Sequence, residues 1–178
     1  MLFRSYSFFD PLFETEIDNG QHLLMGCYKS TLDYLSLINT TEKIEIEKKL
    51  NLSFVVPNGK CIKLKSFFPY YPFDLFESIL TFNLFTFKDR VKIVKLLSGL
   101  LWKRKSNYDK SVSEWLKEQK QSEDVINQFW SLLVKSMMNT SVYNASAELF
   151  KTTLHKVFLK GSYNSKFIIP RVGLSELF

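Results

Sequence analysis

Leu52-Ser-Phe-Val-Val-Pro-Asn-Gly-Lys-Cys-Ile-Lys-Leu-Lys65 places the dipeptide Asn58-Gly59 between two runs of β-favouring residues. Asn-Gly readily adopts the positive φ angles of a two-residue turn, so this arrangement predicts a β-hairpin. Apolar residues alternate with lysines in the second arm, and we expect Ile62 and Leu64 to face inward. The hairpin decides the fold class, because it puts strands into a chain whose remainder has a largely helical pattern.

The residues before the hairpin predict two strands and a helix. Residues 1–20 alternate loosely between apolar and polar, with a turn at Asp10-Pro11, which is typical of two short strands joined by a hairpin-like loop. From Gln21 the pattern becomes helical, and one face is predicted to be buried through about Leu37. The members of that face recur at three- and four-residue steps: Leu24, Tyr28, Leu32 and Leu35.

The residues after the hairpin predict an irregular aromatic loop and then helices almost to the end. Two prolines in Phe67-Phe-Pro-Tyr-Tyr-Pro72 prevent a regular helix there. Asp89 is predicted to cap a helix, Ser111-Val-Ser-Glu114 is a capping box, and Ser122 and Asn144 are predicted to start two more helices. The predicted apolar faces are Val91, Val94, Leu97 and Leu101; Val125, Phe129, Leu133 and Met137, widened by Ile126 and Trp130; and Ala147, Phe150, Leu154 and Phe158.

The composition is that of one ordered piece of protein. The chain has 178 residues, of which 46% are hydrophobic and 16% aromatic, enough apolar mass for one core. Together with the patterns, this predicts an α+β fold, a small mixed or antiparallel sheet with a β-hairpin covered by a mostly helical region. The seventeen Phe and eight Tyr fit an apolar ligand cavity or a surface that is covered by a partner. A codon bias toward Phe explains them equally well.

Charge and rare residues exclude several classes of protein. The net charge of +6 is spread along the chain, so we expect no nucleic-acid partner. The tightest basic cluster, Lys103-Arg104-Lys105, fits a solvated helix end or contact with anionic lipid headgroups. Cys27 and Cys61 form no Cys-x-x-Cys pair, and the chain has only two histidines, so we expect no metal site and no disulfide framework.

The ends and the apolar runs of the chain predict a cytoplasmic protein. The start Met-Leu-Phe-Arg-Ser-Tyr is not a basic segment followed by an apolar core. No uninterrupted apolar run approaches the roughly 20 residues of a membrane-spanning helix.

Taken alone, the residues mark no active site. The sequence contains no Ser-His-Asp constellation, glycosidase carboxylate pair, P-loop or Gly-x-Gly-x-x-Gly turn. Asp18-Asn-Gly-Gln-His22 is ordinary turn chemistry, and His22 alone is interpreted as a hydrogen-bonded, partly buried histidine.

Four blocks of sequence nevertheless resemble a known family, and their order and spacing match it from end to end of the chain. They are Tyr6-Ser-Phe-Phe-Asp-Pro11; Asp18 through Tyr28; Ser111-Val-Ser-Glu-Trp-Leu116 with Gln121-Ser-Glu123 and Phe129-Trp-Ser-Leu-Leu133; and Asn139-Thr140, Ala145-Ser-Ala147 and Ile169-Pro-Arg-Val-Gly-Leu-Ser-Glu-Leu-Phe178. The family is the hydroxysqualene dehydroxylases, or squalene-associated FAD-dependent desaturases, of the phytoene desaturase and amine oxidase superfamily.

The resemblance implies flavin contacts near the start of the chain. In the family a segment ending Gly-Gly-Arg contributes to the flavin site; Arg4 matches its Arg, while Leu2 and Phe3 replace its two glycines. The family's Asp-x-Gly-x-His block lies beside the isoalloxazine ring, and Gly26 would allow tight packing of the following helix. The residues that this resemblance assigns to FAD are Arg4, Gly20, Gln21 and His22; it assigns no catalytic acid or base.

The resemblance also implies a domain plan for an incomplete enzyme. Residues 1–50 would be flavin-proximal strands and a helix of the FAD domain, 51–168 a substrate domain with an apolar tunnel, and 169–178 a truncated return to the FAD domain. We expect a partial FAD-oxidoreductase fold that lacks the N-terminal dinucleotide-binding unit and the C-terminal FAD-binding part. Such a chain should be inactive alone and should need a complementing flavin-binding polypeptide.

The implied reaction is the conversion of hydroxysqualene to squalene in hopanoid biosynthesis, with the chain cytoplasmic and peripheral on the inner face of the membrane. Two alternatives remain open. The chain could be a non-catalytic module that docks on a lipid surface or on another protein. It could also act on another polyisoprenoid, as a carotenoid or phytoene desaturase does.

Overall fold

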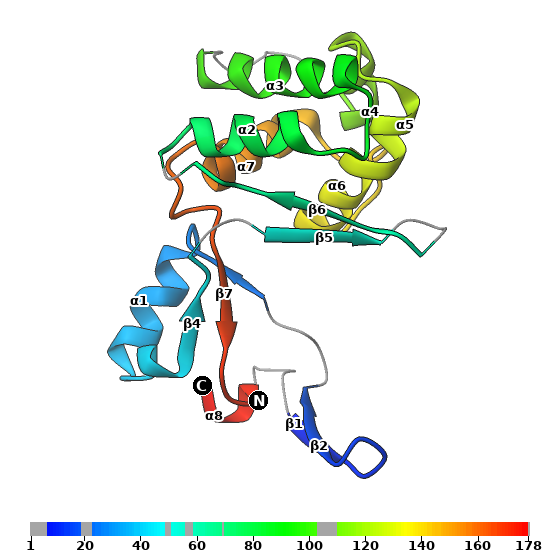
Figure 1. Ribbon diagram of the computed structural model, residues 1–178. Helices are drawn as coiled ribbons and strands as arrows, with labels where there is room; N and C mark the ends of the chain where they lie inside the picture. Colours follow the sequence, from blue (N-terminus) through cyan, green and yellow to red (C-terminus); the bar gives the residue numbers. More distant parts are fainter. Residues whose placement is uncertain are drawn as a thin grey trace. The chain divides into compact units, whose positions relative to one another are not determined.

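Figure 1 shows the computed structural model, which describes residues 7–18, 23–48, 51–55, 59–68, 70–102 and 110–177. The chain divides into two compact units. The first unit combines Met1–Leu50 with Tyr163–Phe178, and the second unit is Asn51–Ser162. The described part is α+β, and its strands form three small antiparallel sheets. No helix within it is long and apolar enough to cross a membrane.

The first unit contains two of these sheets. Its elements are β1 (Ser7–Asp10), β2 (Thr15–Asp18), β3 (Leu24–Met25), α1 (Lys29–Leu37), a 3₁₀ turn (Thr41–Lys43), β4 (Ile44–Ile46), β7 (Phe167–Pro170) and α8 (Leu174–Leu177). β1 and β2 pair antiparallel, which confirms the hairpin predicted within residues 1–20. The other sheet has the order β3-β7-β4, so a strand from near the end of the chain lies between two strands from its start.

A small apolar core holds the first unit together. Leu35 of α1 and Leu177 of α8 are fully buried, and the hydrophobic residues packed around them are Leu24, Ile38, Ile44 and Val172. Ile168, the residue of β7 that pairs with Leu24, is also fully buried. Segments from both ends of the chain therefore share one core.

The predicted helix from Gln21 to Leu37 is wrong over its first part. Leu24 and Met25 are a strand, and α1 begins only at Lys29. Tyr28, expected on the buried face, is exposed, whereas Leu35 is buried as predicted. Residues 24 and 25 pair with β7. This tertiary interaction overrides the helix preference of a segment that is only a few residues long.

The expectation of almost continuous helix after Phe73 fails at β7. Phe167-Ile-Ile-Pro170 is a strand that pairs with β3 on one edge and β4 on the other. Two adjacent β-branched isoleucines favour a strand, but its partners lie more than a hundred residues away, which local patterns do not report. After β7 the chain forms the short helix α8.

The second unit joins one hairpin to a group of helices. Its elements are β5 (Asn51–Val55), β6 (Cys61–Lys65), α2 (Phe73–Thr81), α3 (Phe87–Trp102), α4 (Val112–Glu118), α5 (Glu123–Val125), a π-helical turn (Ile126–Trp130), α6 (Ser131–Met138) and α7 (Ala147–Phe158). The hairpin β5–β6 is confirmed, with Leu52 opposite Leu64 and Phe54 opposite Ile62. Leu64 is buried and Ile62 half-buried, as the alternation predicted.

The helices of the second unit pack around α7. This helix contacts α3, α4 and α6, while α2 lies between β6 and α3 (Figure 1). Two backbone hydrogen bonds join the beginnings of α4 and α7. The N–H of Val112 donates to the carbonyl of Ala145, and the N–H of Ala147 donates to the carbonyl of Lys110. The largest fully buried side chains of this unit include Trp130, Phe82, Phe150, Ile79, Ile93, Leu116, Ile126 and Leu154.

Two helix faces differ from those predicted. On α3 the buried residues are Ile93, Leu96 and Leu97, and Val91 is exposed. Apolar residues occur on several sides of this helix, so its period alone does not decide which side packs. On α7 Val157 is buried in the place expected for Phe158, which is only half-buried.

Two of the helix caps also differ from expectation. The cap of α3 is Thr86, whose Oγ1 accepts the Asp89 backbone N–H at 3.3 Å and donates to the Asp89 carboxylate at 2.7 Å; Asp89 lies inside the first turn. The last long helix begins at Ala147 rather than at Asn144, because the Ser146 hydroxyl accepts the Leu149 N–H at 3.2 Å.

The capping box at the start of α4 is confirmed and predicts a pH effect. The Glu114 carboxylate accepts hydrogen bonds from the Ser111 backbone N–H and from the Ser111 hydroxyl, each at 2.9 Å. These bonds, the backbone bond first, lower the pKa of Glu114. A lowered folded-state pKa means that the stabilisation is complete above the unfolded pKa and is lost as the pH falls through the folded pKa.

We therefore expect Glu114→Gln and Ser111→Ala to reduce the loss of thermal stability on acidification. Thermal melting followed by circular dichroism at a series of acidic pH values measures this. Asp124→Asn, which removes an exposed carboxylate from the neighbouring α5, is the control and should leave the dependence unchanged. An unchanged acid response in Glu114→Gln would show that the capping box does not govern it.

Candidate functional site

The residues that the resemblance assigns to flavin lie outside the described residues. This holds for Arg4, Gly20, Gln21 and His22 alike, and also for the basic cluster at residues 103–105. Their assignment therefore stays a prediction. The described elements that bound the stretch containing Gly20–His22 are β2 on one side and β3 on the other.

Immediately after β3, Gly26 makes a close backbone contact. A Cβ on this residue would stand 2.0 Å from the carbonyl oxygen of Tyr163 and 2.9 Å from its carbonyl carbon. The Gly26 N–H donates to the Lys166 carbonyl at 3.0 Å, and the Cys27 N–H donates to the Asn164 carbonyl at 3.2 Å. The close neighbour of Gly26 is thus the turn before β7, and not the helix that follows it in sequence.

A lone glycine inside the apolar run Leu23-Leu-Met-Gly-Cys27 is the signal that could have revealed this contact. Glycine within a strand pattern often marks a place where another backbone approaches closely. Which backbone approaches is not encoded locally, because Tyr163 is far away in sequence.

The first unit has an open pocket of about 440 Å³. Its walls come from β2, the end of β7 and the entry to α8: Glu16, Pro170, Arg171, Val172, Gly173 and Glu176. Gly173 lies close to β1, since a Cβ there would stand 2.6 Å from the Ser7 hydroxyl oxygen. Sequence patterns gave no sign of this pocket, whose walls are brought together by contacts between the two ends of the chain.

The charges of this pocket do not suit a flavin pyrophosphate. Glu16 and Glu176 both line it, and two carboxylates repel a polyanion. Its one lining cation, Arg171, already pairs with Glu45, with the Nε and Oε2 atoms 3.5 Å apart. This pocket therefore does not suit a flavin pyrophosphate.

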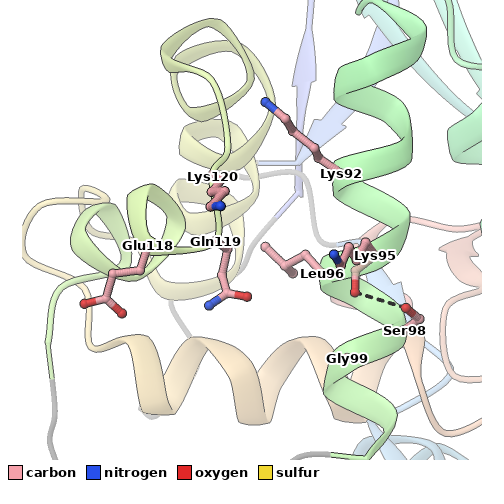
Figure 2. Close-up of a pocket in the computed structure, with 8 residues that line it drawn as sticks. All are labelled: Lys92, Lys95, Leu96, Ser98, Gly99, Glu118, Gln119 and Lys120. Carbon is pink, nitrogen blue, oxygen red and sulfur yellow. Dashed lines mark hydrogen bonds between the residues drawn. The ribbon is translucent and has the colours of Figure 1, made fainter.

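The second unit has an open pocket of about 560 Å³ between α3 and the end of α4. Figure 2 shows Lys92 and Leu96 extending from α3 toward the residues at the end of α4. The residues that line this pocket are Lys92, Lys95, Leu96, Ser98, Gly99, Glu118, Gln119 and Lys120. Three lysines and one glutamate line it beside Leu96 and Gly99, so its lining is mixed polar and apolar and carries net positive charge.

The charges around this cleft are partly matched. Lys92 lies 3.9 Å from the Asp89 carboxylate, and Glu118 pairs with Lys110 on the far side of α4. Lys120, which ends α4 with φ 58°, also lies near the negative end of that helix. Lys92 therefore has a structural partner, and the helix end accounts for the position of Lys120.

The aromatic residues of the second unit are divided between core and surface. Phe54 of the hairpin contacts Phe82 and Phe129, with ring centroids 5.1 and 6.3 Å apart. Phe129 in turn contacts Trp130, which reaches Phe150. These rings pack on one another, so they join the hairpin to the helices as core residues.

Comparison with known proteins adds no family: no protein-family model matches the chain, and no curated protein matches it. The functional argument therefore rests on the sequence blocks and on the geometry described above.

Proposed function

We propose that the chain is part of an FAD-dependent oxidoreductase that acts on a polyisoprenoid, with hydroxysqualene as substrate and squalene as product. The observation that supports this most is the position of the second unit. It is one continuous insertion, Asn51–Ser162, between β4 and β7, which are neighbours in the sheet of the first unit. A substrate domain inserted into a cofactor domain has this arrangement.

Parts of the third and fourth sequence blocks meet in space within the second unit, which supports their being one structural signature. Ser111 and Ser146, from different blocks, form an isolated β-bridge. Gln121 accepts the indole N–H of Trp130 at 3.2 Å.

In this proposal the chain contributes substrate binding more than flavin binding. Hydroxysqualene carries almost no charge, so recognition must come from burial of apolar surface, worth about 25 cal/mol per Å². A reduced flavin, when bound, would supply the hydride that replaces the hydroxyl group, which leaves as water with one added proton. Because the pocket of the first unit does not suit the flavin pyrophosphate, we propose that a complementing polypeptide binds that group.

Reconstitution tests the proposal. The chain is joined to a Gly-rich βαβ unit upstream and a flavin-binding segment downstream, with Leu2→Gly and Phe3→Gly restoring the family's glycines. We expect a yellow protein that converts hydroxysqualene to squalene, measured by flavin absorbance and product analysis. A folded but colourless protein would count against the family assignment, and conversion of phytoene in place of hydroxysqualene would favour the desaturase alternative.

In the reconstituted protein His22→Ala should weaken flavin binding or slow flavin reduction. The control is His155→Ala, which changes the other histidine of the chain, half-buried in the last turn of α7. Flavin titration and stopped-flow reduction measure the effect. If both variants behave alike, His22 has only a structural role.

A further inference from the structure

We propose that residues 66–68 and 70–73, here called the aromatic loop, dock the second unit on the surface of an anionic lipid bilayer. The loop joins β6 to α2 and presents four large rings to solvent. The exposed fractions are 65% for Phe67, 55% for Phe68, 72% for Tyr70 and 64% for Phe73. So many exposed rings on one short segment mark a contact surface, since single exposed apolar residues are ordinary but clusters are not.

The rings are not simply surplus aromatic residues of the core. Phe54, Phe82 and Phe129 already fill the space between the hairpin and the helices, with ring centroids 5.1 to 6.3 Å apart. Phe68, Tyr70 and Phe73 take no part in that packing and stay exposed.

Hydrogen bonds hold the loop in this exposed conformation. The Phe67 backbone N–H donates to the Glu77 carboxylate of α2 at 3.0 Å, and the Ser66 hydroxyl donates to the Phe68 carbonyl at 3.1 Å. At the other end the Asp74 N–H donates to the Tyr70 carbonyl at 3.0 Å. A loop fixed in this way displays its rings without a further ordering cost on binding.

Charged side chains of both signs flank the rings: lysines on β6, and on α2 the carboxylates of Asp74 and Glu77, which accept the backbone N–H groups of Leu75 and Phe67. Lys63 and Lys65 stand on β6, and their cross-strand neighbours Ser53 and Asn51 are uncharged. Within the described residues neither lysine forms an ion pair. Lys65 is two residues from Phe67, a Cα separation of at most about 7 Å, which is shorter than the Debye length of about 8–10 Å in physiological salt.

This combination fits a bilayer better than a protein partner. Phe and Tyr rings favour the boundary between headgroups and acyl chains, and lysines beside them attract anionic headgroups. A protein partner would need a groove that matches the projecting rings of the loop, whereas a fluid bilayer surface needs none. The inference does not require the proposed function, although a bilayer is also where a polyisoprenoid substrate would dissolve.

Vesicle binding tests the proposal with the full chain. We expect the protein to sediment with vesicles of phosphatidylglycerol and phosphatidylcholine, and weakly with phosphatidylcholine alone. The double variant Phe68→Ser/Tyr70→Ser should bind at least about tenfold more weakly, because two buried rings are lost. The double variant Lys63→Gln/Lys65→Gln should lose about fivefold per lysine on anionic vesicles only.

The matched control is Tyr143→Ser/Leu149→Ser, which removes two exposed apolar side chains from other parts of the second unit. It should bind vesicles as the unchanged chain does, and circular dichroism should show all variants folded. Equal loss in the control and the loop variant would overturn the proposal. The proposal would also be overturned if the unchanged chain did not bind vesicles, for example because the loop mediates self-association.

A second readout reports the position of the loop itself. Phe68→Trp should give blue-shifted fluorescence with anionic vesicles and should be quenched by lipids brominated on their acyl chains. If the variant binds vesicles but its fluorescence does not change, the contact lies elsewhere and the assignment to this loop is overturned.

Discussion

Gly26→Ala is expected to unfold the first unit while the second unit stays folded. The added Cβ would lie 2.0 Å from the carbonyl oxygen of Tyr163, and this neighbour is backbone, which cannot rotate away as a side chain would. The two segments must separate, and the bonds from Gly26 to Lys166 and from Cys27 to Asn164 are then lost. We expect a cost of about 3 kcal/mol or more, which is large for a unit with so small a core.

Amide NMR spectra measure this effect for each unit separately. Signals of β3, β4 and β7 should collapse in Gly26→Ala, while those of α2 to α7 should persist. The control is Gly99→Ala on α3, where no atom lies within 4 Å of the added Cβ. Alanine should stabilise that helix by about 0.5–1 kcal/mol. Wild-type spectra for Gly26→Ala would contradict the close contact.

Local signals predicted the elements whose determinants are adjacent in sequence. Asn58-Gly59 indicated the hairpin β5–β6, and Ser111 with Glu114 indicated the start of α4, because each signal and its partner lie within a few residues. β3 and β7 were missed for the opposite reason. Met25 pairs with Phe167, and a strand of two residues has no period from which it could be recognised.

The candidate sites were harder to predict than the fold. The aromatic loop was recognised as irregular from its prolines, yet the exposure of Phe68 and Tyr70 depends on how Ser66 and Glu77 fix the backbone. The flavin residues came from the resemblance alone, and they stay predictions. The cleft beside α3 depends on the approach of α4, which no pattern on either helix specifies.

Trp130→Ala should produce the largest loss of stability in the second unit. Its indole is fully buried, its ring contacts Phe129 and Phe150, and its N–H donates to the Gln121 side chain at 3.2 Å. Gln121 is itself buried and donates to the Lys92 carbonyl of α3 at 3.3 Å, so its side chain links the π-helical turn to α3. Truncation leaves a cavity and an unsatisfied amide, and we expect a cost of about 3–5 kcal/mol.

Denaturant unfolding followed by far-ultraviolet circular dichroism measures this loss, because most of the helical signal belongs to the second unit. The control is Leu132→Ala, two residues further along the same helical segment but exposed, which should change stability by less than about 0.5 kcal/mol. Trp130→Phe keeps a smaller aromatic ring in the core and removes the N–H, so it retains part of the packing and loses the bond to Gln121; it should cost about 1–3 kcal/mol. If Trp130→Phe were as damaging as Trp130→Ala, the bond to Gln121 rather than the packing would hold these helices together.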